Sequence, residues 1–342
     1  MTTIHEPPTE PSRLPERVSG PPLRSRLVPR QRHIPVLATL VLFLVMYGAG
    51  IANYEGFSDT QVLLNVFIDN AFLLVVAVGM TFVILTGGID LSVGAAVALT
   101  TMIVAELLQK GWPPLVVLPL VLALGVLFGT GMGAIIHVFD IEPFIATLAG
   151  MFLCRGLSYV IATESIPITD PFWTSVANQK IKFGGFHVSV SVVVAAVVVL
   201  VAAYVLAYTR FGRSVYALGG NRQSALLMGL AVGRTRIGVY AISGFCSALG
   251  GVLLSFYMLS GYGQHAQGME LDAIAAVVIG GTVLTGGSGF VFGTVLGVLV
   301  LGMIQTLITF QGNLSSWWTK IFIGALLFAF IVLQRAVGRR TT

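Results

Sequence analysis

The 342-residue chain is 56% hydrophobic and only 10% charged, with a mean hydropathy of +0.92. Soluble domains carry about 25% charged residues, so this composition excludes the soluble globular class and indicates a protein that crosses a membrane several times. The net charge of +5 comes from arginines gathered in three stretches, while the four lysines lie elsewhere. That clustering is a topology signal and excludes a nucleic-acid-binding surface.

Residues 1–33 contain seven of the fourteen prolines and six arginines among few aliphatic side chains, which predicts a disordered basic cytoplasmic tail. It lacks the short apolar core and cleavage site of a signal peptide. The apolar body, residues 34–335, is predicted to be all α-helical. Its ten predicted spans are Ile34–Asn53, Val62–Leu85, Leu91–Leu108, Pro114–Val138, Pro143–Ala162, His187–Tyr208, Ile237–Ser260, Leu271–Leu284, Phe290–Phe310 and Trp317–Leu333.

The span count agrees with the arginine distribution. Six spans separate the N-terminal tail from the arginine-rich loop 209–236, and four separate that loop from the basic tail 336–342. Both numbers are even, so all three basic stretches are predicted to face the cytoplasm. Trp112, Trp317 and Trp318 fall at span ends on the opposite side, where indole rings contact lipid headgroups.

Thr163–Phe186 is the one long connection predicted on the external side. It holds Trp173, and Pro167 and Pro171 are expected to prevent a regular helix there. Two interpretations stay open, an ordinary external loop or a docking surface for a partner on that face.

Two glycine-rich segments interrupt the apolar helices, and both read T-G-G, five residues, G. The first is Thr86–Gly94 and the second is Thr285–Gly293. Double glycine ends a helix, and interrupted segments in both halves of a chain indicate a transport pathway. Tight helix packing through small residues explains the glycines equally well. The predicted pathway residues here are Gly87, Gly88, Asp90, Ser92, Thr285, Gly286 and Gly287.

Arg155 is the one arginine outside residues 1–33, 209–236 and 335–342, and it lies inside a predicted span. A guanidinium at that depth needs a carboxylate, backbone carbonyls or water, and Asp90 is a candidate partner. Thr147 lies about two helical turns earlier on roughly the same face. Thr147 and Arg155 are therefore predicted to line the pathway, with a structural hydrogen bond between helices as the alternative.

The loop Thr209–Arg236 carries five arginines and no acid. Asn221 is a good N-cap and Gly229 suits a left-handed C-terminal residue, which predicts a short helix over Arg222–Met228. Two helical turns are not stable alone in water, so this helix needs support from its own protein or a partner. It is either a turn within a basic loop or a docking element that a soluble motor protein grips.

The sequence lacks the motifs that several functions require. The chain has no G-x-x-x-x-G-K-[ST] loop for ATP, no histidine–cysteine cluster for a metal, and no Ser/His/Asp order for hydrolysis, so it is predicted not to be an enzyme and to hold no cofactor. Acidic residues in the spans are few, which disfavours a proton- or sodium-driven carrier. If the chain moves a solute uphill, the energy is expected to come from another protein through the arginine-rich loop.

Four blocks, in order, resemble the permease subunits of bacterial ribose-type sugar ABC importers: GGIDLSVG (Gly87–Gly94), PFIATLAGMFLCRG (Pro143–Gly156), RFGRSVYALGGNRQSALLMGL (Arg210–Leu230) and ELDAIAAVVIGGTVLTGGSG (Glu270–Gly289). The resemblance covers roughly residues 70–332. ESIPI (Glu164–Ile168) and LSSWWTKI (Leu314–Ile321) are most similar to the galactofuranose-type permease.

The resemblance implies import of a monosaccharide across the bacterial inner membrane. It implies three partners: a tandem-domain ATPase, a periplasmic sugar-binding protein and a second permease chain, identical or different. It also implies that the coupling helix to the ATPase is Asn221–Gly229, with contributions from Asn221, Arg222, Ser224, Ala225, Met228 and Gly229. Gln223 occupies the position at which other importer classes carry the Glu that begins the coupling-helix motif. A secondary carrier or channel that works alone remains the alternative.

Overall fold

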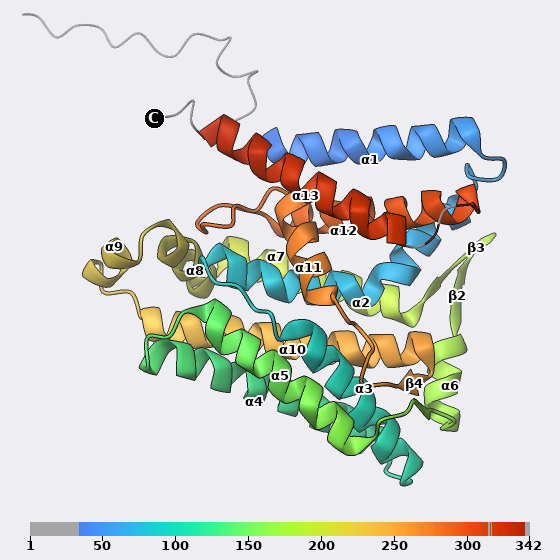
Figure 1. Ribbon diagram of the computed structural model, residues 1–342, viewed down its shortest axis with the longest axis horizontal. Coiled ribbons are helices and arrows are strands. Elements are labelled where there is room, and N and C mark those ends of the chain that lie inside the picture. Colours follow the sequence, from blue (N-terminus) through green and yellow to red (C-terminus); the bar gives the residue numbers. More distant parts are fainter. Residues whose placement is uncertain (1–33, 314, 316, 339–342) are drawn as a thin grey trace, which may run out of the picture.

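The structure, a computed structural model, describes residues 34–313, 315 and 317–338. The long helices run side by side in one bundle (Figure 1). In chain order the elements are α1 (Ile34–Asn53), α2 (Thr60–Leu85), α3 (Val93–Gln109), α4 (Pro114–Val138), α5 (Pro143–Ile161), β1 (Ile166–Pro167), α6 (Pro171–Asn178), β2 (Lys180–Phe183), β3 (Phe186–Ser189), α7 (Val190–Tyr208), α8 (Arg210–Gly220), α9 (Arg222–Leu227), α10 (Val232–Met258), β4 (Ser260–Gly261), α11 (Met269–Ile279), α12 (Val291–Gln311) and α13 (Trp317–Gly338).

The all-α membrane-protein fold predicted from the sequence is confirmed. Within the described residues, seven helices are long and apolar enough to cross a membrane, namely α1, α2, α4, α5, α7, α10 and α12. α3 and the Trp317–Val332 part of α13 are shorter apolar helices. Each predicted span thus contains a helix, although α10 begins at Val232, five residues before the predicted Ile237.

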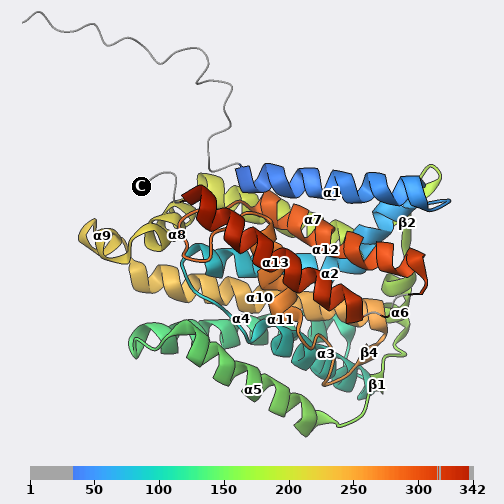
Figure 2. The same ribbon diagram turned by 45° about the horizontal axis from the view of Figure 1, so that its top comes forward.

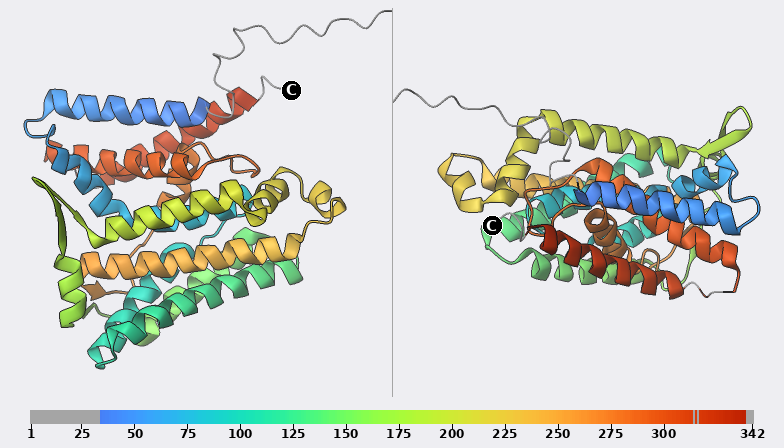
Figure 3. Two further views of the ribbon diagram at one scale, coloured as in Figure 1. Left: turned by 180° about the vertical axis from the view of Figure 1, so that it is seen from behind. Right: turned by 90° about the horizontal axis from the view of Figure 1, so that it is seen from above.

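α8 and α9 lie at one end of the bundle, and α6 with the β2–β3 hairpin lies at the other (Figures 1 and 3). We call these the α9 end and the α6 end. The start of α1 and the end of α13 both lie toward the α9 end (Figure 2). This arrangement agrees with the even span counts, since the chain returns to the same end after six spans and again after four. The tails 1–33 and 339–342 lie outside the described residues.

α2, α10 and α12 are mostly buried and form the core, whereas α1, α4, α5 and α7 expose most of their apolar side chains. α4 approaches α10 closely because Gly125 and Gly129 of α4 lie directly against Gly244 of α10. A Cβ atom at any of the three would overlap the facing backbone. Small residues at helix interfaces are how membrane helices pack without a hydrophobic driving force between them.

Two segments break the run of long helices in the interior. α2 ends at Thr86–Gly87, where Gly87 has a φ of +78°, and an extended stretch leads to α3. α11 ends at Gly280–Gly281, where Gly281 has a φ of +93°. α11 runs across the direction of the long helices near the centre of the molecule (Figure 1). The predicted span Leu271–Leu284 is therefore not a continuous helix, but a short transverse helix with non-helical chain on either side.

The connection at the α6 end is more ordered than the sequence predicts. Pro171 does not prevent a helix; it begins α6 at the first helical position, where its missing N–H costs nothing, and the Asp170 side chain caps the helix by accepting from the Trp173 N–H. Trp173 is fully buried and its indole N–H donates to Ser255 Oγ. β1 pairs with β4, and β2 pairs with β3 around the Gly184 turn, so two small antiparallel sheets complete this end.

Candidate functional site

α9 forms as the capping residues predict. The Asn221 side chain accepts from the Ser224 N–H at 2.9 Å, and Gly229 follows the helix with a φ of +74°. The six-residue helix is supported by its own chain, because Ala225 is fully buried against Leu218 and Val232. Ala225 therefore packs α9 against its own chain, whereas the resemblance implies that this residue contributes to coupling with the ATPase.

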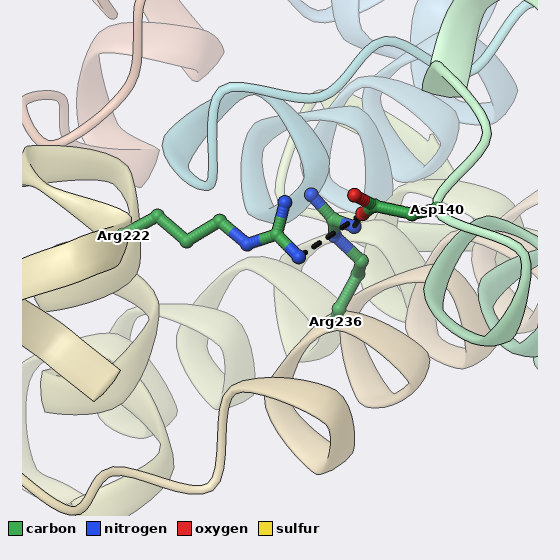
Figure 4. A network of polar contacts seen from close by, with 3 residues as sticks. All are labelled: Asp140, Arg222 and Arg236. Carbon is green, nitrogen blue, oxygen red and sulfur yellow. Dashed lines mark hydrogen bonds and ion pairs between the residues drawn. The ribbon is translucent and has the colours of Figure 1, made fainter. Parts of the chain in front are cut away.

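An ion-pair cluster holds α9 from the side. The Arg222 guanidinium donates to Asp140 Oδ1 at 3.0 Å, and Arg236 Nη1 lies 3.6 Å from the same oxygen (Figure 4). Asp140 lies in the connection between α4 and α5, so the cluster joins three separate parts of the chain. The hydrogen bond from Arg222 and the positive charge of Arg222 lower the pKa of the Asp140 carboxyl. The acid therefore stays ionised and keeps its partners near neutral pH.

The C-terminal end of α9 and its cap residue expose apolar side chains. Leu227 is 90% exposed, Met228 is 67% exposed and Leu226 is 53% exposed. α9 projects beyond the other helices at its end of the bundle (Figure 1). Three adjacent exposed apolar side chains on a projecting, capped helix are typical of a protein–protein contact.

The two T-G-G segments meet at the α9 end. The Gly287 N–H donates to the Leu85 carbonyl at 2.9 Å, and Gly87 lies against the Thr285 carbonyl. Gly219 of α8 fits between them so closely that a Cβ there would overlap the Leu85 carbonyl. Only Asn221 separates α9 from α8, and α8 touches both T-G-G turns through Gly219. Of the predicted pathway residues, Gly87, Thr285, Gly286 and Gly287 lie here.

Asp90 and Ser92 lie deeper, in the extended stretch before α3. Asp90 is 3% exposed, and it accepts from the Ser92 N–H and Oγ and from Ser243 Oγ of α10 at 2.6–3.0 Å. Thr147 Oγ1 accepts from the Leu91 N–H at 3.1 Å, so Thr147 packs against the same stretch. Gly88 lies beside the Tyr240 hydroxyl. The structure thus brings Gly88, Asp90, Ser92 and Thr147 together.

The Arg155–Asp90 pairing considered from the sequence is wrong. Arg155 Nη1 donates to the carbonyls of Gly263 and His265 at 2.6 and 2.9 Å, and Asp90 is satisfied by serine donors instead. Residues 262–268 form the non-helical chain that leads from the α6 end to α11. Arg155 therefore holds this connection in place from α5.

The helices α3 and α11 begin next to each other. A Cβ at Gly94, in the first turn of α3, would overlap Glu270 Oε2 and would also meet the Ala266 carbonyl. The N-terminal ends of α3 and α11 therefore meet. Interrupted helices whose ends meet at mid-depth are the usual construction of a substrate site in transporters.

Comparison with known proteins identifies the family of the chain. Residues 62–331 match the family described as "Branched-chain amino acid transport system / permease component". The chain belongs to this permease family. It is 47% identical to the inner membrane ABC transporter permease protein YjfF of Escherichia coli K12, over 90% of this chain and 93% of that protein. It is 42% identical to the fructose import permease FruG of Bifidobacterium longum (89% and 91%) and 38% identical to the ribose import permease RbsC of Bacillus subtilis (86% and 91%). No solved structure gives a significant match.

The sequence prediction missed some residues of the candidate site. Asp140 and Ser243 lie 82 and 153 residues from the side chains they bind, and no local pattern connects them. Gly219 was missed as well, because the Gly219–Gly220 pair ends α8 and glycine is common at helix ends, so the pair does not indicate a contact. Within the described part of the chain, no three His, Cys, Asp or Glu side chains are placed to hold a metal ion, and both cysteines are buried free thiols.

Proposed function

We propose that the chain is the transmembrane permease subunit of an ATP-binding-cassette importer that moves a monosaccharide into the cytoplasm of a bacterium. The observation that carries the proposal is α9, a capped and anchored helix with an exposed apolar tip at the end of the bundle toward which both described chain ends lie. The arginines of loop 209–236 support placing that end on the cytoplasmic side of the inner membrane.

Three partners follow from this assignment. An ATPase subunit contacts α9 through Leu226, Leu227 and Met228, while Asn221, Arg222, Ser224, Ala225 and Gly229 shape and fasten the helix. A periplasmic sugar-binding protein docks at the α6 end, where Phe172, Phe183 and Phe186 are exposed. A second permease chain, identical or different, completes the transporter within membrane lipid.

The coupling route runs from α9 through α8 to the two T-G-G turns. ATP-driven movement of α9 shifts Gly219, and Gly219 is packed against the chain that precedes α3 and follows α11. These two interrupted segments then shift relative to the long helices, so that the pathway opens alternately to the two sides of the membrane. In this mechanism nine residues act as the moving elements that line or support the pathway. They are Gly87, Gly88, Asp90, Ser92, Thr147, Arg155, Thr285, Gly286 and Gly287.

The substrate we propose is galactofuranose or a related pentose or hexose. Two relatives are named as ribose and fructose import permeases, and the ESIPI and LSSWWTKI blocks resemble the galactofuranose type. A neutral sugar also fits a chain with few acidic residues in its spans.

Reconstitution tests the proposal. Proteoliposomes that contain the chain with its ATPase, its binding protein and a second permease chain should take up radiolabelled D-ribose, D-fructose or D-galactose only when ATP is present. Leu227→Asp should abolish uptake, because it places a charge on the apolar contact, and Leu227→Met should retain it. Uptake by the purified chain without ATPase would instead establish a stand-alone carrier or channel.

A further inference from the structure

A polar cavity opens between five helices toward the α6 end. About 580 Å³ of space is bounded by the first turns of α2, the last turns of α10 and α12, and the start of α11, and it adjoins a second cavity of about 340 Å³ against α13. Asn70, Leu73, Asp272, Gln305 and Thr309 line both. The volumes fall within the roughly 300–1,000 Å³ typical of small-molecule sites. None of the pathway residues predicted from the sequence lines either cavity.

We propose that this joined cavity, which we call the polar vestibule, is a binding site for a neutral polyhydroxy ligand, a monosaccharide, within this one chain. The inference rests on the proposed function and adds a place where the permease itself contacts the sugar.

The lining supplies hydrogen-bond donors and acceptors in a mixture that matches hydroxyl groups. Asp69 contributes a carboxylate, Asn65, Asn70 and Gln305 contribute amides, and Thr319 contributes a hydroxyl. The Gln305 amide makes no hydrogen bond to another described residue, so its donor and acceptor remain open to a ligand. Each sugar hydroxyl can donate to a carboxylate or amide oxygen and accept from an amide N–H.

The charge in the vestibule disfavours an anionic ligand. Lys320 is its one lysine, and that ammonium is already bound to both carboxylate oxygens of Asp272 at 2.9 and 2.7 Å. Among the described residues, Asp69 has no cationic partner and accepts only a long hydrogen bond from Tyr257, at 3.3 Å. The Asp69 carboxylate would therefore repel an anionic ligand. A hydroxyl group of a neutral polyol can instead donate a hydrogen bond to it.

Aromatic side chains complete the lining. Phe72 and Tyr257 contact each other at one side of the vestibule, with ring centroids 5.8 Å apart and ring planes tilted by 49°, and Phe310 and Trp317 also line it. Ring faces offer apolar surface to the C–H face of a sugar, while Trp and Tyr keep a polar atom for its hydroxyls. The vestibule thus combines the two surfaces that a monosaccharide presents.

Cysteine protection tests the vestibule independently of transport. In the full chain in membranes, Gln305→Cys should react with a membrane-impermeant methanethiosulfonate reagent, and the native thiols should not, because Cys154 and Cys246 are buried. Millimolar D-ribose, D-fructose or D-galactose should slow the reaction several-fold, and gluconate at the same concentration should not. Gln311→Cys, on the same helix but outside the vestibule, should show no sugar protection.

Uptake by the complete transporter gives a second readout. Gln305→Leu and Asp69→Leu should each lower sugar uptake roughly tenfold, as expected for one lost hydrogen bond to a polar or charged group, and Gln311→Leu should not. Labelling of Gln305→Cys that no sugar slows, or wild-type uptake by both vestibule variants, would overturn the site. Sugar protection without any ATP-dependent uptake would keep the site and refute the importer, so the two failures are distinguishable.

Discussion

The backbone N–H of Gly287 donates to the carbonyl oxygen of Leu85 across 2.9 Å, which joins the chain after α11 to the last residue of α2. Gly219 of α8 lies against both atoms of this bond. A movement of α8 therefore reaches both interrupted segments through one contact, without a chain of intervening side chains. This geometry gives the proposed coupling route a definite point at which it can be broken.

We expect Gly219→Ala to break it. The added methyl would overlap the Leu85 carbonyl, and overpacking of this kind costs about 1–3 kcal/mol. The variant should unfold at a lower temperature in detergent, and sugar uptake per ATP hydrolysed should fall in the complete transporter.

Gly220→Ala is the matched control, since the next residue in the same helix has open space around its Cβ position. It should leave both the unfolding temperature and the uptake ratio close to wild type. Equal effects of the two substitutions would mean that helix propensity, and not the contact with Leu85, is responsible.

Local signals predicted much of this fold. The α9 boundaries follow from Asn221 and Gly229 because caps act within a few residues, and α1 and α4 follow from uninterrupted apolar runs. The sequence held no comparable local signal for which side chains are buried or for contacts between distant residues. Trp173 is buried by α10, more than eighty residues later, and Arg155 binds backbone carbonyls, which every residue type carries. The vestibule could not be predicted because five helices contribute to it and its polar residues are scattered singly along them.

Asp140→Asn should loosen α9. The variant removes the charge that Arg222 and Arg236 share, so amide hydrogens of residues 221–229 should exchange faster in hydrogen–deuterium exchange at neutral pH. Glu142→Gln, an exposed acid two residues later, should have no effect on those amides.

The same cluster predicts a pH dependence. Because Arg222 lowers the pKa of Asp140 in the folded protein, the ion pair stabilises α9 above the ordinary carboxyl pKa and is lost as the pH falls through the lowered value. Exchange at residues 221–229 should stay slow from neutral pH into the mildly acidic range. A rise in exchange already between pH 7 and 6 would contradict the assignment to Asp140.

Trp173→Ala should destabilise the α6 end. The indole is fully buried, packs against Phe256 with ring centroids 4.6 Å apart and donates to Ser255, so its removal should cost about 3–5 kcal/mol. Phe172→Ala, whose ring is 45% exposed, should change stability by only about 0.5 kcal/mol. Thermal unfolding of the two purified variants separates these outcomes; similar midpoints would mean that α6 is not docked on α10.

Arg155→Ala should release the connection that leads to α11. The substitution leaves the carbonyls of Gly263 and His265 without their donor, at about 1–3 kcal/mol for each buried group left unpaired. Amides in residues 262–268 should exchange faster and sugar uptake should fall more than tenfold. Arg155→Lys should restore part of the uptake, because one ammonium can reach one of the two carbonyls but lacks the planar reach of the guanidinium. If Arg155→Ala transports normally and residues 262–268 stay protected, then the position of α11 does not depend on α5, and the role of Arg155 in the pathway must be abandoned.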